Sequence, residues 1–189
     1  MRFDILTLFP EMIEQACSHS IMKRAIDSNI LSISTVNPRD FTLDKHKKVD
    51  DTPYGGGAGM VLMAQPYVDA YESVEKINNS ITLMMTPQGE KFDNKMCAEL
   101  ATYNQIIILC GHYEGFDERI RTIIQPKEVS IGDFVLTGGE LPALCLMDSV
   151  SRKIDGTLGK IESMEEDSFE NGLLEYPQYT KPREYRGFK

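Results

Sequence analysis

Thr86-Pro-Gln-Gly89 is the first of three glycine-bearing loops in this sequence; the other two are Cys110-Gly-His-Tyr-Glu-Gly-Phe-Asp-Glu-Arg119 and Ser130-Ile-Gly-Asp-Phe-Val-Leu-Thr-Gly-Gly-Glu-Leu-Pro142. Each loop follows an apolar stretch that has the character of a strand. Glycine lets a backbone approach a ligand closely or adopt a positive φ angle. The pattern therefore predicts a site made largely of main-chain N–H and C=O groups, which recognises the shape of its ligand rather than a charge.

Outside these loops, apolar strand patterns alternate with helical spacings. We expect strands at 2–8, 31–36, 81–85, 106–109 and 129–131, and helices at 10–26, 66–77, 93–102, 116–124 and 140–150. This alternation predicts an α/β domain with a mainly parallel sheet and helices on both faces. Ligands of such sheets bind outside the carboxyl ends of the strands, which is where the three loops fall.

Two long segments do not fit the alternation. Residues 39–60 are polar and glycine-rich, and a loop of this length inside a compact domain is usually functional or disordered. Residues 155–189 are acidic and offer only Leu173, Leu174 and scattered aromatic side chains for burial. We therefore expect one domain at 1–154, followed by an extended arm or linker at 155–189.

Composition limits the class of protein. The 189 residues are 41% hydrophobic, enough for one substantial core, and no apolar run approaches the roughly 20 residues that span a bilayer. The first residues read as a strand rather than a signal peptide, so we expect a cytoplasmic protein. The net charge of −9 argues against unaided, sequence-independent binding of nucleic acid. Local basic clusters such as Lys45-His-Lys-Lys48 leave room for a phosphate contact, although each is more simply a solvated surface.

Several common chemistries have no support in the sequence. Neither a dinucleotide-binding nor a P-loop glycine pattern occurs. The three histidines lack the spacing of zinc ligands, and Ser149 and Ser151 have no nearby partner for nucleophilic catalysis. The cysteines are spaced singly, which favours buried structural thiols over a catalytic or metal-binding role; they are Cys17, Cys97, Cys110 and Cys145.

One acidic cluster has two interpretations. Glu165-Glu-Asp-Ser-Phe169 is most simply a solvated stretch of the arm. With Arg152 at the end of the preceding helix, however, it could supply a general base and a cation for a developing oxyanion. Residue type alone does not separate these alternatives.

The motifs together resemble one family closely, the bacterial tRNA (guanine-N1)-methyltransferases known as TrmD, within the SPOUT class. The resemblance covers nearly the whole chain. It is carried by 4–10, 39–41, Asp50-Asp-Thr-Pro-Tyr-Gly-Gly-Gly-Ala-Gly-Met60, 87–89, 111–115, 117–119, 130–142, Glu166-Asp-Ser-Phe169 and Gly172-Leu-Leu-Glu-Tyr-Pro-Gln-Tyr-Thr180.

This resemblance implies a deep trefoil knot that binds S-adenosylmethionine in a bent shape, mainly through backbone groups. Topology rules would not have suggested a knot. Glu114 is also a candidate for a magnesium-linked role near the target base, and no other metal site is implied. The implied cofactor contacts are Thr86, Pro87, Gly111, Tyr113, Glu114, Ile131, Gly132, Leu136, Gly138, Gly139 and Pro142.

The implied methyl acceptor is N1 of guanine 37 in a tRNA in which guanine 36 precedes it. N1 carries a weakly acidic proton, so methyl transfer needs a base, and the negative charge that develops on O6 needs a cation. By alignment of the motifs, the base would be Asp167 and the O6 partner Arg152. Members of the family are homodimers in which the arm of one subunit reaches the knot of the other.

The sequence departs from the family pattern in three places. His112 stands where many members have arginine, and Met85-Thr86 replaces the commoner Leu-Ser. The chain ends at Lys189, where the family normally continues into a basic domain that grips tRNA, so we expect that domain to be absent and tRNA binding to be weak. Two other functions stay open: a non-catalytic dimeric module that binds RNA or a ligand, and, opposed by the missing glycine pattern, an NAD-dependent oxidoreductase.

Overall fold

The computed structural model describes residues 1–158, 168–169 and 174–188. Within these residues, five strands form one sheet in the order β2-β1-β6-β5-β7, and every neighbouring pair is parallel. This arrangement confirms the predicted α/β fold with a mainly parallel sheet. The strands are β1 Arg2–Leu6, β2 Ser32–Val36, β5 Ser80–Lys91, β6 Gln105–Cys110 and β7 Lys127–Ser130.

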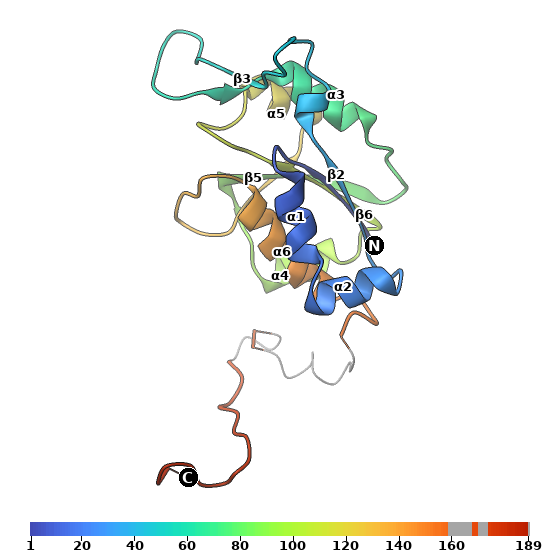
Figure 1. The fold of residues 1–189 in the computed structure, drawn as a ribbon, viewed down its shortest axis with the longest axis vertical. Helices are drawn as coiled ribbons and strands as arrows, with labels where there is room; N and C mark the ends of the chain where they lie inside the picture. Colours follow the sequence, from blue (N-terminus) through green and yellow to red (C-terminus); the bar gives the residue numbers. More distant parts are fainter. Residues whose placement is uncertain (159–167, 170–173, 189) are drawn as a thin grey trace.

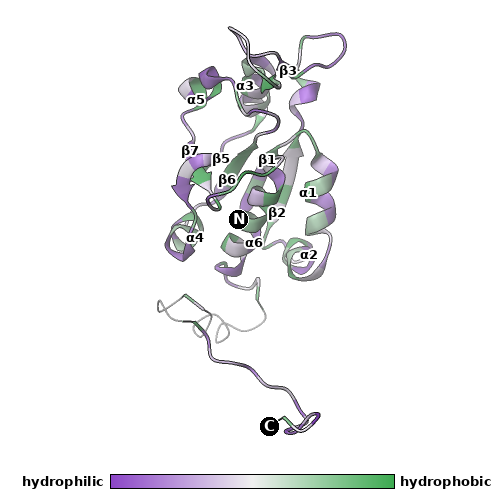
Figure 2. Ribbon diagram, turned by 90° about the vertical axis from the view of Figure 1, so that its left-hand side faces the viewer, coloured by the Kyte–Doolittle hydropathy of each residue, from purple (hydrophilic) through white to green (hydrophobic). Residues whose placement is uncertain are grey.

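Helices cover both faces of the sheet (Figure 1). One face carries α1 Pro10–Cys17, α2 Ser20–Asp27, α4 Asn94–Leu100 and α6 Glu140–Arg152, and the other carries α3 Ala64–Ser73 and α5 Glu118–Ile124. The central strand β6 is buried along its whole length, because alternate residues point to opposite covered faces. Ile108 packs into the first core cluster, while Ile107 and Leu109 pack into the second. The hydropathy colouring in Figure 2 shows this apolar centre.

The expected helix at 10–26 is wrong as a single element, because it divides into α1 and α2. Ser18 donates its hydroxyl to the Gln15 carbonyl at 2.7 Å, His19 is extended, and Ser20 has a φ of 52°. Serine side chains compete with the backbone for helical hydrogen bonds, and a positive φ cannot continue a right-handed helix. The apolar spacing continues across this break, which is why the sequence pattern concealed it.

The strand predicted at 81–85 continues to Lys91 as β5, so Thr86-Pro-Gln-Gly89 is not a turn at its end. The pairing with β7 shifts register between Met85 and Glu90, and the four residues form the irregularity. Gly89 is required there, since a side chain would collide with the backbone of Val129. The helix expected at 66–77 is α3, which begins at Ala64 and ends at Ser73.

The long segment at 39–60 is ordered. It contains a 3₁₀ turn, Pro38–Asp40, and a two-residue strand, β3 Asp50–Asp51, which pairs antiparallel with β4 Val61–Leu62. The glycine-rich loop between these strands is attached to the loop after β6, because Glu114 N–H donates to Met60 O at 2.9 Å. The segment therefore forms a shelf beside that loop.

Three of the four cysteines are buried as expected, but Cys145 is exposed on α6. The helical spacing around Cys145 is apolar, yet its side chain lies on the open face of the helix. Burial raises the pKa of the Cys17 thiol to about 11. A buried, protonated thiol is a poor nucleophile, which agrees with a structural role.

Residues 176–188 lie away from the α/β domain (Figure 1). All side chains at 174–188 are exposed. None of the helices in the described part of the chain is long and apolar enough to cross a membrane.

Candidate functional site

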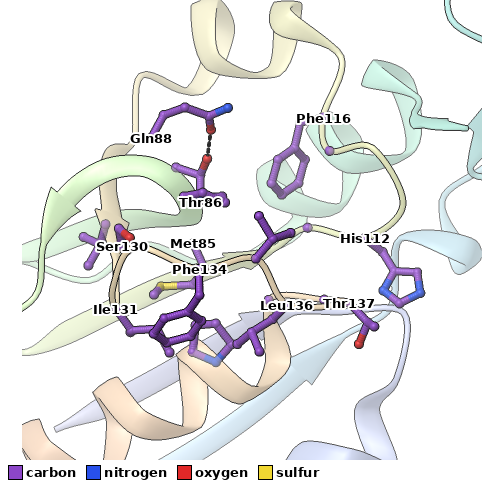
Figure 3. A pocket seen from close by; sticks show the side chains of 18 of the residues that line it. Met85, Thr86, Gln88, His112, Phe116, Ser130, Ile131, Phe134, Leu136 and Thr137 are labelled. Atoms are coloured by element: carbon purple, nitrogen blue, oxygen red, sulfur yellow. Dashed lines mark hydrogen bonds between the residues drawn. The ribbon is translucent and has the colours of Figure 1, made fainter. Parts of the chain in front are cut away.

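The irregularity at 86–89 within β5 and the glycine-bearing loops after β6 and β7 meet around one cavity of about 380 Å³. Figure 3 shows Thr86 and Gln88 on one side, Phe116 and His112 on another, and Ile131, Phe134 and Leu136 across from them. The carboxyl edge of the sheet is where the sequence placed a ligand. The volume falls within the ~300–1,000 Å³ usual for sites that hold small molecules.

A close crossing of two backbone segments forms the inner wall of the cavity. Gly139 N–H donates to Gly111 O at 2.8 Å, and Gly138 bridges to His112. A Cβ at Gly139 would lie 2.7 Å from the Cys110 α-carbon and 2.8 Å from Gly111 N, closer than real Cβ atoms approach. Glycine is therefore required at 139 because the neighbouring backbone leaves no room for a Cβ. The backbone angle does not require it, since a φ of −82° suits any residue.

A buried tyrosine hydroxyl is bonded to the end of β6, just before the cavity wall at Gly111. Tyr67, fully buried on α3, donates its hydroxyl to Cys110 O at 2.6 Å. Burial raises the pKa of the Tyr67 phenol and of the Cys110 thiol well above their ordinary values. Both groups stay neutral near pH 7, so neither provides an ionised nucleophile next to the ligand.

The rim of the cavity is polar on one side and apolar on the other. The Thr86 hydroxyl is hydrogen-bonded to Gln88 Oε1, and Ser130 Oγ donates to Gly132 O at 3.1 Å. Facing them, Phe134 is 54% exposed and Val135 is 81% exposed, which leaves apolar surface available to a planar group. This arrangement can hold a ligand that has both an apolar ring and several hydrogen-bonding atoms.

The loop after β6 carries a left-handed backbone and a carboxylate. Tyr113 has a φ of 58° and Gly115 a φ of 111°, and together they turn Glu114 toward the glycine-rich shelf. Gly59 lies so close to the Glu114 side chain that a Cβ there would collide with the carboxylate. Glu114 thus lies between the cavity and the shelf, where a second ligand could approach the first.

All eleven residues that the resemblance implied for the cofactor line this one cavity. Sequence reasoning missed other lining residues. Phe134 and Val135 lie inside the quoted loop 130–142, and their apolar character in a polar loop was a usable signal. Gln88 and Arg121 gave no such signal. The missed residues are Met85, Gln88, His112, Gly115, Phe116, Arg121, Val129, Ser130, Phe134, Val135 and Thr137.

Arg152 does not lie in this cavity. It ends α6, ten residues after Pro142, and at ~1.5 Å per residue the helix separates the two positions by about 15 Å. Arg152 lines a second hollow of about 430 Å³, together with Asn94, Ser149 and Glu175. Asp167, the predicted base, lies outside the described residues. Among the residues described, no group of three or more His, Cys, Asp and Glu side chains could hold a metal ion.

Comparisons with known proteins give a consistent result. A family model described as tRNA (Guanine-1)-methyltransferase TrmD matches residues 1–189. The tRNA (guanine-N(1)-)-methyltransferase of Desulforamulus reducens is 54% identical over an alignment of 192 residues that covers 100% of this chain and 76% of the relative. That of Staphylococcus aureus strain Newman is 52% identical over 187 residues, covering 99% and 76%. The crystal structure of the tRNA (m1G37) methyltransferase from Aquifex aeolicus superposes with a TM-score of 0.83 at 40% identity, covering 100% of this chain and 79% of that one.

Proposed function

The chain belongs to the tRNA (guanine-1)-methyltransferase family, and on that premise we propose that it methylates N1 of guanine 37 in tRNA from S-adenosylmethionine. The observation that carries the proposal is the single cavity in which all three glycine-bearing loops meet. A tRNA substrate supports a place in the cytoplasm.

The cavity suits S-adenosylmethionine because its wall is backbone. The crossing of Gly138–Gly139 over Gly111 leaves no room for side chains, so a ligand there meets main-chain N–H and C=O groups. Ile131, Leu136 and Pro142 offer apolar surface for an adenine ring. We infer that this crossing is part of the trefoil knot, because the loop after β7 packs directly against the loop after β6 at this point.

When bound, S-adenosylmethionine supplies an electrophilic methyl group on a sulfonium ion. The protein must then remove the N1 proton of guanine and stabilise charge on O6. We assign the first task to the Asp167 carboxylate and the second to the planar guanidinium of Arg152, which can donate two hydrogen bonds. Glu114, between the cavity and the shelf, is assigned a magnesium-linked role near the base.

The position of Arg152 supports a homodimer with shared sites. Arg152 lies about 15 Å along α6 from the cavity of its own subunit. The exposed arm at 174–188 buries none of its side chains on its own domain and needs a surface to rest on. Both features are accounted for when the arm and Arg152 of one subunit complete the cavity of the other.

The activity is tested with labelled S-adenosylmethionine and an unmodified tRNA transcript that carries guanine 36 and guanine 37. We expect label at N1 of guanine 37, and none in matched transcripts with adenine at 37. We expect a weaker signal when adenine replaces guanine 36. Cofactor binding without transfer would favour a non-catalytic binding module instead.

The shared site is tested by mixing two inactive variants, Gly139→Val and Asp167→Asn. If the sites are shared, a heterodimer joins the intact cavity of the second variant to the intact arm of the first, and activity returns. If each subunit is self-sufficient, the mixture stays inactive. Light scattering on the separate variants controls for dimer formation.

A further inference from the structure

The shelf at 39–60 carries a lysine-rich turn that the reaction described above does not use. This lysine turn is Lys45-His-Lys-Lys48, and all four of its side chains are exposed. Asp44 holds the turn in shape, because its Oδ1 accepts from His46 N–H at 2.8 Å and from Lys48 N–H at 3.2 Å. These two hydrogen bonds lower the pKa of the Asp44 carboxyl. The turn is therefore ordered and presents its lysines to solvent.

Two of the lysines are available to an anion. Lys47 is paired with Asp40, its Nζ 3.3 Å from the carboxylate oxygen, whereas Lys45 and Lys48 form no ion pair with any described residue. In the shelf as a whole, four Lys and Arg side chains match four Asp side chains, so the cationic character is confined to the lysine turn. The whole chain has a net charge of −9. A polyanion is therefore directed to this turn, because the rest of the surface repels it.

An aromatic side chain stands on a second turn of the shelf. Tyr54 is fully exposed, at the second position of a turn that Gly56 N–H closes on Pro53 O at 3.1 Å. Gly55 has a φ of 87°, the angle that the third position of a type II turn requires. The turn fixes the backbone that carries the ring. An exposed ring on a fixed turn is suited to stack on a planar base, since little of the protein must be ordered on binding.

Backbone hydrogen bonds join the lysine turn to the loop that lines the cavity. Val49, which follows the turn directly, is buried, and its carbonyl accepts from Met63 N–H at 2.8 Å. The neighbouring Leu62 N–H donates to Gly115 O at 2.9 Å, and Gly115 lines the cavity. The position of the lysines relative to the cavity is thus set by the fold.

The exposed tyrosine lies within reach of the cavity mouth. Tyr54 is five residues before Gly59, so at no more than ~3.6 Å per residue their α-carbons are at most about 18 Å apart. Gly59 lies against the side chain of Glu114, between the cavity and the shelf. Figures 1 and 2 both show β3 of the shelf beside α3. A nucleic acid with one base at the cavity therefore runs alongside the shelf.

We propose that the shelf is the docking surface for the anticodon arm of the tRNA, where Lys45 and Lys48 contact backbone phosphates and Tyr54 stacks on a base near the target guanine. This inference rests on the proposed methylation of guanine 37. Phosphate contacts set the position of a nucleic acid, and the unpaired bases of a loop offer faces for stacking. An acidic peptide would use the lysines alone, so the exposed ring favours RNA.

The lysines are tested by binding of the unmodified transcript with guanine 36 and guanine 37, measured by fluorescence anisotropy over a series of salt concentrations. Each phosphate contact contributes ~0.7–0.9 to the slope of log affinity against log salt. Lys45→Gln combined with Lys48→Gln should therefore reduce the slope by about 1.5 and weaken binding at low salt on the order of tenfold. Lys23→Gln combined with Arg24→Gln, which removes two exposed cations from α2, is the matched control and should leave the slope unchanged.

Tyr54 is tested by a pair of variants in the same assay. Tyr54→Ala should weaken tRNA binding by roughly 5- to 100-fold, the range for losing one stacked base, whereas Tyr54→Phe keeps the ring and should bind like the parent chain. The salt slope should not change in either variant, because stacking releases no counterions. Affinity for S-adenosylhomocysteine should match the parent in every variant, since no residue of the shelf is among the described residues that line the cavity. Thermal unfolding checks that each variant is folded.

Two results would overturn the docking surface: an unchanged affinity and salt slope in the double lysine variant, or equal tRNA affinities of Tyr54→Ala and Tyr54→Phe. Both are read from variants of a chain that still methylates guanine 37. A parent chain that binds S-adenosylhomocysteine but neither binds nor methylates the transcript would contradict the proposed function, and the docking surface with it. The failure of the surface alone is therefore distinguished from the failure of the proposed function.

Discussion

The cavity between the glycine-bearing loops and the chain at 174–188 are opposites in how they are built. The cavity wall is a backbone crossing, fixed by Gly139 N–H on Gly111 O and by the buried Tyr67 hydroxyl on Cys110 O. The arm, at 174–188, exposes every side chain. The difference indicates that one subunit by itself shapes the cavity that we propose for the cofactor, whereas we propose that the arm gains a function only against another surface.

The same contrast appears within one helix. At the start of α6, Glu140 is buried beneath the cavity, and at its end Arg152 lines a separate hollow. One element thus contributes to the cavity of its own subunit at its first turn and, as we propose, to the cavity of the partner at its last. The following predictions test this division, beginning with the largest expected effect.

Gly139→Val should abolish cofactor binding and with it all methyl transfer. The valine Cβ would need space already taken by the Cys110 α-carbon and Gly111 N, so the crossing must open. Calorimetry with S-adenosylhomocysteine measures the loss. Gly187→Ala, in the arm with open space around it, is the control and should bind normally. Tight binding by Gly139→Val would show that the crossing does not shape the site.

Asp167→Asn should lower single-turnover methyl transfer by roughly 10²- to 10⁴-fold, the range typical of losing a general base. Asparagine keeps the shape of the side chain but cannot take the proton from N1. Affinity for S-adenosylhomocysteine should not change, because the described residues already enclose the cavity on the α/β domain. Near-normal transfer would mean that Asp167 only solvates the arm.

Arg152→Lys should lower methyl transfer by a smaller factor, on the order of 10-fold, because it keeps the positive charge but loses the planar pair of donors for O6. Lys153→Arg, at the neighbouring position, serves as the control. Rates at saturating cofactor and tRNA separate this effect from weaker binding. A loss confined to cofactor affinity would show that Arg152 does not take part in methyl transfer.

Tyr67→Phe should destabilise the domain by about 1–2 kcal/mol, since the buried Cys110 carbonyl would lose its hydrogen bond from the hydroxyl while the ring still fills its place. Urea unfolding measures the change. Tyr71→Phe, whose hydroxyl is only partly buried near Thr82, should cost less. Equal losses of stability in the two variants would show that the hydrogen bond from Tyr67 to Cys110 contributes no more than the partly buried one at Tyr71.

Removal of residues 159–189 should change affinity for S-adenosylhomocysteine by less than about threefold, although it eliminates methyl transfer. Among the described residues, those that line the cavity all precede residue 143, which is the reason to expect this independence. Dialysis against the cofactor product checks it. A large loss of affinity would show that the arm contributes to cofactor binding and would weaken the comparison between the two regions.

The sequence was sufficient to predict the class of fold and the position of the cavity, because both predictions depend on patterns among neighbouring residues. The unbroken apolar run at 106–109 predicts a strand buried on both faces, and β6 is one. Glycines at 111, 138 and 139 predict a wall of backbone, and they meet around one cavity. The break at Ser20 was beyond such reasoning, since apolar spacing reports which face is buried and not whether the backbone stays helical across it.

By itself, then, the sequence determined the parallel α/β domain, the backbone-lined site at its carboxyl edge and the family to which the chain belongs. Only the tertiary structure decided that Arg152 lies far from the cavity of its own subunit, that residues 39–60 form a shelf beside Glu114, and that Glu140 and His112 both lie against Gly138. The physical reason is distance along the chain. Periodicity and glycine patterns report interactions within a few residues, whereas these contacts join segments that meet only when the sheet has assembled.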